Sequence, residues 1–338
     1  MNLSSGAGRH GAPDPLLHPS VSRVAGQFKA KELHAARSGR DVMQALAAVV
    51  RDSSASSMDS LAPELEMNMD ALIAVMPAYA PPINVMHDVH SSFESARRSG
   101  QPLDLFRTSM AQAGDSYLEQ SQQARMSIAD SALQLLPKGG VVFTYTLSET
   151  VLAVLHRARD LGMALSVLVT ESRPNGDGRT TASTVAGDQA HVEIGIDASI
   201  AELIPRADVM FVGAEAILSD GSAVCKVGTY PSALMAKRSG VPVYVLVDSR
   251  KFHAGSLRGQ ELPLDRIDPD DVLSEGTSRQ AKVCGHLFDR TPPQLITAVI
   301  TEHGSLAPVL VSQWMLRMPQ SEFVAFRLRD RTAGVRGA

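Results

Sequence analysis

The chain has 338 residues, of which 44% are hydrophobic and 20% charged, and its formal net charge at pH 7 is −4. This length suits one large domain or two domains. The slightly acidic balance argues against direct nucleic-acid binding. The sequence has no run of about 18 apolar residues, which a transmembrane helix would need. Two cysteines and unclustered histidines argue against a disulfide framework and a structural metal. We expect a cytoplasmic protein without a cofactor.

The first part of the chain has the pattern of a helical domain over residues 20–137. Residues 1–19 are rich in Gly, Ser and Pro and predict a disordered leader. Apolar residues then recur at three- and four-residue intervals, which is typical of amphipathic helices. They predict a helix pair over 20–52 with a break at Ser38-Gly39, and further helices at 58–76, 83–98 and 103–136.

The second part, residues 138–318, alternates strands with helices. Apolar and β-branched runs lie at 141–145, 165–169, 192–196, 209–212 and 243–247, and helix patterns lie at 149–161, 198–204 and 232–239. Strands that are apolar throughout and alternate with helices indicate a parallel sheet covered on both faces. The predicted fold class is therefore α/β, with an N-terminal helical domain followed by a Rossmann-like parallel-sheet domain.

Residues 319–338 form a separate tail in this scheme. Residues 323–328 alternate in the manner of an edge strand. Four arginines make the end of the chain cationic: Arg327, Arg329, Arg331 and Arg336. The tail is either solvated and partly disordered or a contributor to subunit contact.

Ligands of such sheets bind at the carboxyl ends of the strands. The loops that follow these ends are residues 145–149, 170–179, 213–229 and 248–252, and they are rich in polar residues and glycine. Neither GxGxxG nor GxxxxGK[ST] occurs, so no dinucleotide fingerprint or P-loop is present. The residues of these four loops are the candidates for a binding site.

Two cations in these loops suit a phosphate group. Arg173 follows a strand, where its planar guanidinium could bind two phosphate oxygens, or it could be a surface residue paired with Glu171. Lys226, Gly228 and Thr229 precede a predicted helix start, which could bind an anion through free N–H groups. The alternative there is a helix capped by Thr229 beside a solvated lysine.

The remaining candidates are carboxylates, a thiol and a lysine. Glu215 could act as a general acid/base or could only brace its loop. Cys225 could be a thiolate nucleophile, but no histidine lies near it in the sequence and a small buried hydrophobe is the favoured interpretation. Asp248 and Lys251 could complete the pocket or pair with each other.

Several ordered motifs of this sequence resemble one superfamily. They are VGAEAILSDG at 212–221, KVGTY at 226–230, VTESRP at 169–174, VDSRKF at 247–252 and FDRTPPQLITAVITEHG at 288–304, with a weaker likeness around Asn84. This superfamily joins the alpha, beta and delta subunits of translation initiation factor 2B with the isomerases of methylthioribose 1-phosphate and ribose 1,5-bisphosphate.

The resemblance implies a helical domain, a Rossmann-like domain through which two copies form a homodimer, and a cleft that holds a phosphorylated ribose. It also implies catalysis by a cysteine after the first strand and by an aspartate of the central motif. This sequence has Thr146 and Glu215 at those two places, Cys225 in place of an asparagine, and Ala80 in place of an arginine. A threonine hydroxyl cannot replace a thiolate without an added base.

Two functions remain open from the sequence, beside a scaffold with a decayed pocket. The first is a divergent enzyme that binds a ribose-type 1-phosphate and runs an aldose–ketose isomerase-like reaction. In it Glu215 and Thr146 are the catalytic candidates, and the expected substrate-binding residues are Ser148, Arg173, Cys225, Lys226, Gly228, Thr229, Asp248 and Lys251. The second is a non-catalytic regulatory subunit, similar to those of initiation factor 2B, that senses a sugar phosphate or a nucleotide.

Overall fold

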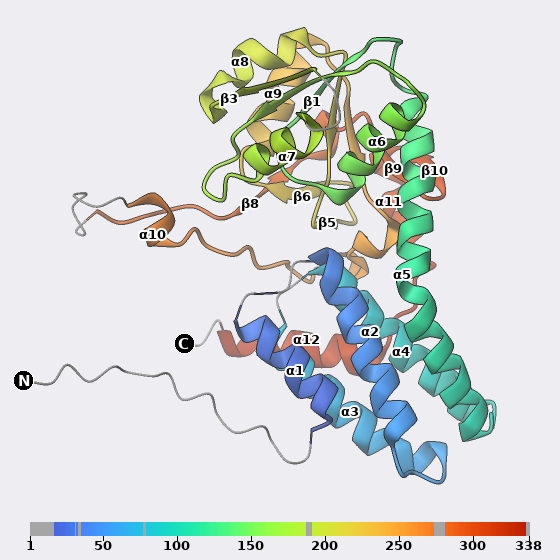
Figure 1. Cartoon of the computed structure of the whole chain (residues 1–338). Helices are drawn as coiled ribbons and strands as arrows, with labels where there is room; N and C mark the ends of the chain where they lie inside the picture. Colours follow the sequence, from blue (N-terminus) through green and yellow to red (C-terminus); the bar gives the residue numbers. More distant parts are fainter. Residues whose placement is uncertain are drawn as a thin grey trace, which may run out of the picture.

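The computed structural model describes residues 17–30, 32, 35–76, 79–186, 191–273 and 281–335. Figure 1 shows a layer of helices at one end of the molecule and an α/β region at the other, with helix α5 running along both. The prediction of a helical N-terminal region followed by a mostly parallel sheet is confirmed. The predicted leader lies outside the described residues, apart from its last three positions.

Five helices build the N-terminal part: α1 (Pro19–Lys29), α2 (Ala35–Asp52), α3 (Met58–Val75), α4 (Ala80–Arg98) and α5 (Leu103–Leu133). Their apolar faces meet in one core, whose fully buried side chains include Leu46, Leu65 and Phe93. The rings of Phe93 and Phe106 lie 5.7 Å apart in an edge-to-face arrangement. We define these helices, together with α12 below, as the helical layer.

Two details of the helical prediction were wrong. Helix α2 runs through Ser38-Gly39, because Gly39 serves close packing: a Cβ there would lie 2.3 Å from Oη of Tyr117 on α5. Helix α4 begins at Ala80, with Pro81 and Pro82 in its first turn. Proline is tolerated there because the first N–H groups of a helix have no partner within the helix.

Seven of the described strands form the main sheet in the order β10-β9-β7-β4-β1-β2-β3. Their bounds are β1 (Val141–Thr144), β2 (Ser166–Thr170), β3 (His191–Gly195), β4 (Val209–Val212), β7 (Val243–Leu246), β9 (Ala298–Thr301) and β10 (Gly304–Leu306). All pairings in it are parallel except that of β9 with β10. The edge strand β3 is partly exposed, which departs from the expectation of a strand covered on both faces.

Helices cover both faces of this sheet. One face packs against α5, α6 (Glu149–Asp160) and α7 (Asp177–Ala186), and the other against α8 (Ile200–Leu203), α9 (Thr229–Ser239) and α11 (Val311–Met315). The β-branched runs supply both cores: Val142 and Val167 point to the first face, and Val212 and Val245 to the second. This alternation explains why the strands are apolar throughout.

Short elements complete the α/β region. They are the 3-10 turns η1 (Asp197–Ser199), η2 (Ile204–Arg206), η3 (Ser249–Lys251), η4 (Ala254–Arg258), η5 (Pro293–Leu295) and η6 (Pro308–Leu310), and helix α10 (Pro269–Val272). A small antiparallel sheet is formed by β5 (Ala216–Ile217), β6 (Ala223–Lys226) and β8 (Phe288–Thr291). Part of the segment expected to be one loop, residues 213–229, is therefore a β-hairpin. An arm that carries α10 projects from the body (Figure 1).

The tail is not an edge strand but helix α12 (Glu322–Val335). Val324 and Leu328 lie one turn apart and are buried in the helical layer, next to α3 and α4. Arg327 forms an ion pair with Asp70, and Arg331 donates hydrogen bonds to the carbonyl oxygens of Ile73 and Met76. These arginines bind the chain's own helices; Arg336 lies outside the described residues.

None of the described helices combines the length and the apolar character needed to cross a bilayer. The cytoplasmic location stays a prediction.

Candidate functional site

The loop after β1 and the hairpin strand β6 meet at one carboxylate. Thr146 Oγ1 donates to Oδ2 of Asp177 at 3.3 Å, and Lys226 Nζ lies 2.9 Å from the same oxygen. The exposed fractions of the Lys226 and Asp177 side chains are 12% and 24%. Two predicted site residues, Thr146 and Lys226, are therefore brought together by a third that the sequence analysis missed.

Asp177 is positioned by the first turn of α7. Its neighbour Gly178 packs directly on the end of β2: a Cβ there would lie 1.7 Å from the carbonyl oxygen of Thr170. An acidic residue in the first turn is also favoured by the helix dipole. The sequence shows an aspartate between Gly176 and Gly178 after a buried strand, but it does not show which side chains Asp177 contacts.

The loop after β2 is organised by Asp197, which was also missed. Its two carboxylate oxygens accept hydrogen bonds from the backbone N–H groups of Ser172 and Arg173, both at 2.8 Å. Ser172 has a φ of 58°, in the left-handed region that few non-glycine residues adopt. These two bonds hold the turn in that conformation.

Arg173 is exposed and contacts the arm. Its Nη2 donates to the carbonyl oxygen of Asp271 at 2.8 Å. The alternative of a pair with Glu171 was wrong, since Glu171 pairs with Arg179. A second cation at the strand ends is thus held by an oxygen of the chain itself.

Glu215 lies between the main sheet and the hairpin. Its backbone N–H donates to the carbonyl oxygen of Val224 at 2.8 Å, and its side chain is half-buried. Within the described ranges, Oε2 of Glu215 is buried and has no hydrogen-bond partner. Burial raises the pKa of Tyr79, and the charges of Asp265 and Glu215 raise it further. Because Tyr79 precedes α4, Glu215 lies at the boundary between the sheet and the helical layer.

Cys225 is 1% exposed. Burial raises the pKa of its thiol well above the usual value, and the nearby Asp289 and Glu215 carboxylates add to the effect. A thiol in this state is not a thiolate nucleophile. The interpretation of Cys225 as a small buried hydrophobe is confirmed.

The start of α9 already holds a carboxylate. Oδ2 of Asp289 accepts hydrogen bonds from the backbone N–H groups of Gly228 at 2.8 Å and Tyr230 at 3.0 Å. Burial raises the pKa of Asp289 and these hydrogen bonds lower it. Burial has the larger effect, and the pKa is raised to about 6. The N–H groups expected to bind a phosphate thus bind Asp289.

Two neighbouring residues also differ from expectation. Thr229 is fully buried, and the position before the helix is Gly228, so Thr229 is not the cap. Gly228 has a φ of 103°, and a Cβ there would lie 1.9 Å from Oη of Tyr145. Only glycine fits between Tyr145 and this helix start. Lys226 is ion-paired rather than solvated.

The loop after β7 is tied to both regions of the molecule. Lys251 Nζ donates to the carbonyl oxygen of Ala214 at 2.6 Å, next to Glu215. Asp248 Oδ1 accepts from the N–H of Arg250 at 3.0 Å, and burial raises the pKa of Asp248 while Lys251 and Arg250 lower it. Asn84 Nδ2, from α4, donates to the carbonyl oxygens of Arg250 and Phe252 at 2.6 and 2.8 Å.

Ser148 has a local structural contact. Its Oγ accepts from the N–H of Val151 at 3.4 Å at the start of α6. A Cβ at Gly213 would lie 2.4 Å from this Oγ, so Ser148 packs against the end of β4. Capping of α6 is thus a structural role for Ser148.

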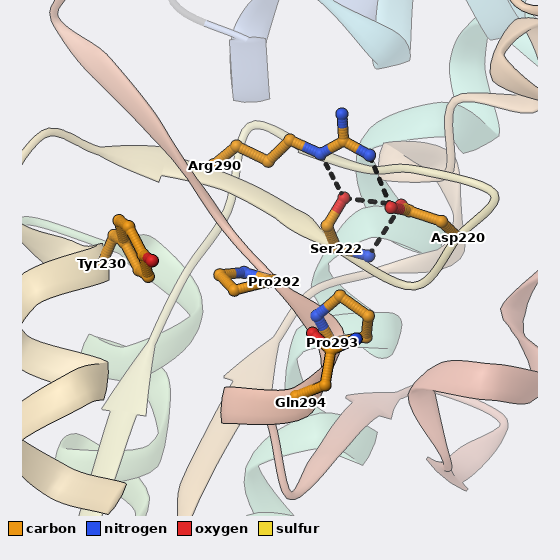
Figure 2. Close-up of a pocket in the computed structure, with 7 residues that line it drawn as sticks. All are labelled: Asp220, Ser222, Tyr230, Arg290, Pro292, Pro293 and Gln294. Atoms are coloured by element: carbon orange, nitrogen blue, oxygen red, sulfur yellow. Dashed lines mark hydrogen bonds and ion pairs between the residues drawn. The ribbon is translucent and has the colours of Figure 1, made fainter.

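A hollow of about 470 Å³ lies beside these loops and is shown in Figure 2. Arg290 Nε donates to Ser222 Oγ at 2.7 Å within it, and its Nη2 pairs with Asp220. The lining residues are Asp220, Ser222, Tyr230, Arg290, Pro292, Pro293 and Gln294. None of the predicted site residues lines it.

The carboxyl edge of the main sheet, by which we mean the loops after β1, β2, β4 and β7 with the end of β6, thus gathers cations, carboxylates and hydroxyls. In the part of the chain that the structure describes, four hydroxyls at or next to this edge are buried without a hydrogen bond: those of Thr144 and Thr170 at strand ends, of Ser172, and of Thr229 at the start of α9. Buried polar atoms without partners are few in folded proteins, and each one calls for an explanation. This chemistry suits a ligand with an anionic group and several hydroxyls.

Comparison with curated proteins gives relatives of two kinds. Ribose 1,5-bisphosphate isomerase of Thermococcus kodakarensis is 26% identical over 293 residues, which cover 85% of this chain and 91% of the relative. Translation initiation factor eIF2B subunit alpha of Dictyostelium discoideum is 29% identical over 230 residues, covering 64% and 70%.

Solved structures show the same fold. eIF2B beta of Chaetomium thermophilum has a TM-score of 0.71 at 19% identity and covers 91% of this chain and 94% of its own. The 5-methylthioribose 1-phosphate isomerase of Pyrococcus horikoshii has a TM-score of 0.70 at 21% identity, covering 88% and 87%. A profile of the Initiation factor 2 subunit family matches residues 32–308. The predicted resemblance is confirmed, and this chain belongs to the Initiation factor 2 subunit family.

Proposed function

We propose that this chain binds a ribose-type 1-phosphate at the carboxyl edge and interconverts its aldose and ketose forms, with Glu215 as the acid/base. The observation that carries the proposal is the state of Glu215, which is half-buried and, among the described residues, has no partner for Oε2. A carboxylate without a structural partner is available to a substrate proton. The ribose 1,5-bisphosphate isomerases among the relatives support this reaction and substrate class.

The reaction rearranges the sugar without changing its composition. The bond between C1 and the ring oxygen breaks, the carbon-bound hydrogen of C2 ends on C1, and the hydroxyl proton of C2 ends on the former ring oxygen. The phosphate ester is unchanged. Glu215 carries a proton in this exchange, and the Lys251-bound carbonyl of Ala214 fixes the backbone beside it. Proton transfer by a placed carboxylate contributes about a hundredfold or more to a rate.

The phosphate is assigned to the cations of the edge. Lys226 is paired with one carboxylate oxygen and Arg173 donates to one carbonyl oxygen, and we assign both cations to a phosphate that takes the place of these oxygens. Thr146, the second predicted catalytic residue, is proposed to contact a sugar hydroxyl, because a threonine hydroxyl bonded to Asp177 is a poor nucleophile.

The bond between Thr146 and Asp177 favours a second candidate function. In it the chain senses a sugar phosphate or a nucleotide without turnover and assembles with partner proteins, as a regulatory subunit. The similarity to eIF2B subunit alpha supports this alternative. Purification from the native source distinguishes the two: stable co-purifying subunits support regulation, and a lone homodimer argues against it.

We also propose that two copies associate through the α/β region. Static light scattering on the purified protein tests this, with an expected mass of twice the 36.0 kDa of one chain. A mass equal to one chain at micromolar concentration overturns it.

The proposed reaction is tested by product formation. Ribose 1-phosphate and ribose 1,5-bisphosphate are each incubated with the protein, and a ketose carbonyl is sought by ¹³C NMR. We expect turnover of at least one, lost about a hundredfold or more in Glu215→Gln. Glu193→Gln, on the exposed strand β3 where Glu193 pairs with Arg206, is the control and should stay active. Binding of both sugars without any product overturns the enzymatic proposal.

A further inference from the structure

The Lys226–Asp177 pair puts an anion of the chain where a ligand phosphate would bind. Lys226 Nζ lies 2.9 Å from Oδ2 of Asp177, which is the distance of a charge-assisted hydrogen bond. Lys226 is only 12% exposed, so little water screens the pair. The cation assigned to phosphate is thus already neutralised.

Asp177 is held in this position from a second side. Thr146 Oγ1 donates to the same oxygen, Oδ2, at 3.3 Å, and Thr146 is 7% exposed. Asp177 also lies in the first turn of α7, where a negative charge is stabilised. Lys226 has its own restraint, since its Nζ lies 5.5 Å from the centre of the Phe288 ring. Neither partner can leave the pair without losing another contact.

We infer that Asp177 is a specificity-determining residue of the proposed site: it competes with the ligand phosphate for Lys226. This inference rests on the proposed function, because it assigns the phosphate to Lys226. A phosphate reaches Nζ only against the negative charge of Asp177, so free inorganic phosphate binds weakly. A phosphorylated sugar binds because its hydroxyls add contacts, among them one to the Thr146 hydroxyl that Asp177 releases. Asp177 therefore makes the site select the whole sugar phosphate over the bare anion.

Asp177→Asn tests this on the full chain. The amide keeps the size of the side chain and removes the charge that holds Lys226. We expect inorganic phosphate, measured by isothermal titration calorimetry, to bind about tenfold or more tightly than to the wild type, a change of about 1.4 kcal/mol, because the variant removes a negative charge that lies next to Nζ of Lys226. Ribose 1-phosphate should gain less, so the preference for the sugar falls. The control is Asp130→Asn, which breaks the exposed pair between Arg157 of α6 and Asp130 of α5.

A double-variant cycle shows whether Lys226 carries the effect. In a Lys226→Gln background, Asp177→Asn should change phosphate affinity less than about twofold, because no cation is left to compete for. If Asp177→Asn still raises phosphate affinity tenfold in the Lys226→Gln background, then Asp177 does not act by competing for Lys226. Asp177→Ser, also accepted at helix starts, repeats the measurement if the asparagine variant does not fold, with circular dichroism as the check.

The outcomes separate this inference from the proposed function. If Lys226→Gln abolishes phosphate binding while Asp177→Asn leaves it unchanged, the phosphate site stands and the role of Asp177 falls. If Lys226→Gln changes the binding of neither phosphate nor ribose 1-phosphate, the assignment of phosphate to Lys226 falls, and this inference falls with it.

Discussion

In the helical layer and at the carboxyl edge of the sheet, cationic side chains donate hydrogen bonds to backbone carbonyls, but the surroundings of these contacts differ. Arg331 of α12 caps carbonyls of α3 beside a core of buried apolar side chains. Lys251 and Arg173 also bind carbonyls, but among carboxylates and buried hydroxyls. The same contact lies beside an apolar core in the first region and among polar groups of the proposed site in the second.

This comparison predicts that variants in the two regions change different properties. Phe93→Ala in the helical layer should have the largest effect on stability. Phe93 is fully buried against Phe106, and loss of such a ring costs about 3–5 kcal/mol of unfolding free energy. Urea denaturation measures this cost. Leu316→Ala, at a side chain 74% exposed, is the control, and equal losses in both variants would contradict the assignment of the core.

Glu215→Asp, at the carboxyl edge, should have the opposite effect: it should lower activity and leave stability nearly unchanged. It keeps the charge but withdraws the carboxylate by one methylene, and a displacement of about 1 Å can lower a rate about a hundredfold. We expect that loss in kcat/KM for the sugar phosphate, measured by product NMR. The unfolding free energy should stay within about 0.5 kcal/mol, because Oε2 has no partner among the described residues to lose. A rate that rises would show that this site prefers the shorter carboxylate.

The boundary between the two regions predicts a pH effect. Burial, together with the smaller effects of His253, Arg258 and His90, lowers the pKa of His87 to about 4. The unfolded chain therefore binds a proton between about pH 6.5 and 4 that the folded chain does not, and stability falls as the pH falls through this window. His87→Gln should remove about 2 kcal/mol of the difference between pH 7 and pH 5.

Chemical denaturation at the two pH values measures this difference. His191→Gln, at an exposed position on β3, is the matched control. Asp88 and Asp289 act in the opposite direction, because burial raises the pKa of each to about 6, so their contribution to stability falls as the pH rises from about 4 to 6. An unchanged pH dependence in the His87 variant would contradict its neutral, buried state.

The smallest effects are expected in helix α12, at Arg331 and then at Arg327. Arg331→Met keeps much of the apolar stem and removes the hydrogen bonds to Ile73 and Met76, at a cost of about 1 kcal/mol. Arg327→Met removes a half-exposed ion pair with Asp70 and should cost less than about 0.5 kcal/mol. Thermal unfolding of the two variants compares them. A larger cost at Arg327 would show that α12 is held mainly by its surface charges.

The sequence predicted the sheet well and the tail badly for physical reasons. Buried parallel strands appear in a sequence as runs of β-branched residues, a pattern that amphipathic helices lack. The predicted bounds of β1, β4 and β7 therefore agree with the structure almost to the residue. Residues 323–328 fit two periods at once. Phe323, Ala325 and Arg327 alternate as in a strand, yet Val324 and Leu328 are four apart and share one helix face. Only packing against α3 and α4 decides between them.

The site was predicted in part for a similar reason. Strand ends could be located from the sequence, so Thr146, Glu215 and Lys251 were placed in the right loops, whereas Lys226, expected in a loop, ends strand β6. Asp177 and Asp197 could not be recognised, because their partners are more than twenty residues away and meet them only when β1, β2 and β6 are assembled. At the start of α9, where we expected a phosphate, the N–H groups donate to the carboxylate of Asp289, a residue that is distant in the sequence.

A crystal structure of the protein with ribose 1,5-bisphosphate tests the central claim most directly, because it shows which side chains the phosphates and the sugar contact. The account predicts one phosphate oxygen within about 3 Å of Lys226 Nζ, in place of the Asp177 carboxylate, and a sugar hydroxyl against Glu215. A ligand bound in the hollow of Tyr230 and Arg290, with Lys226 still paired to Asp177, would contradict it.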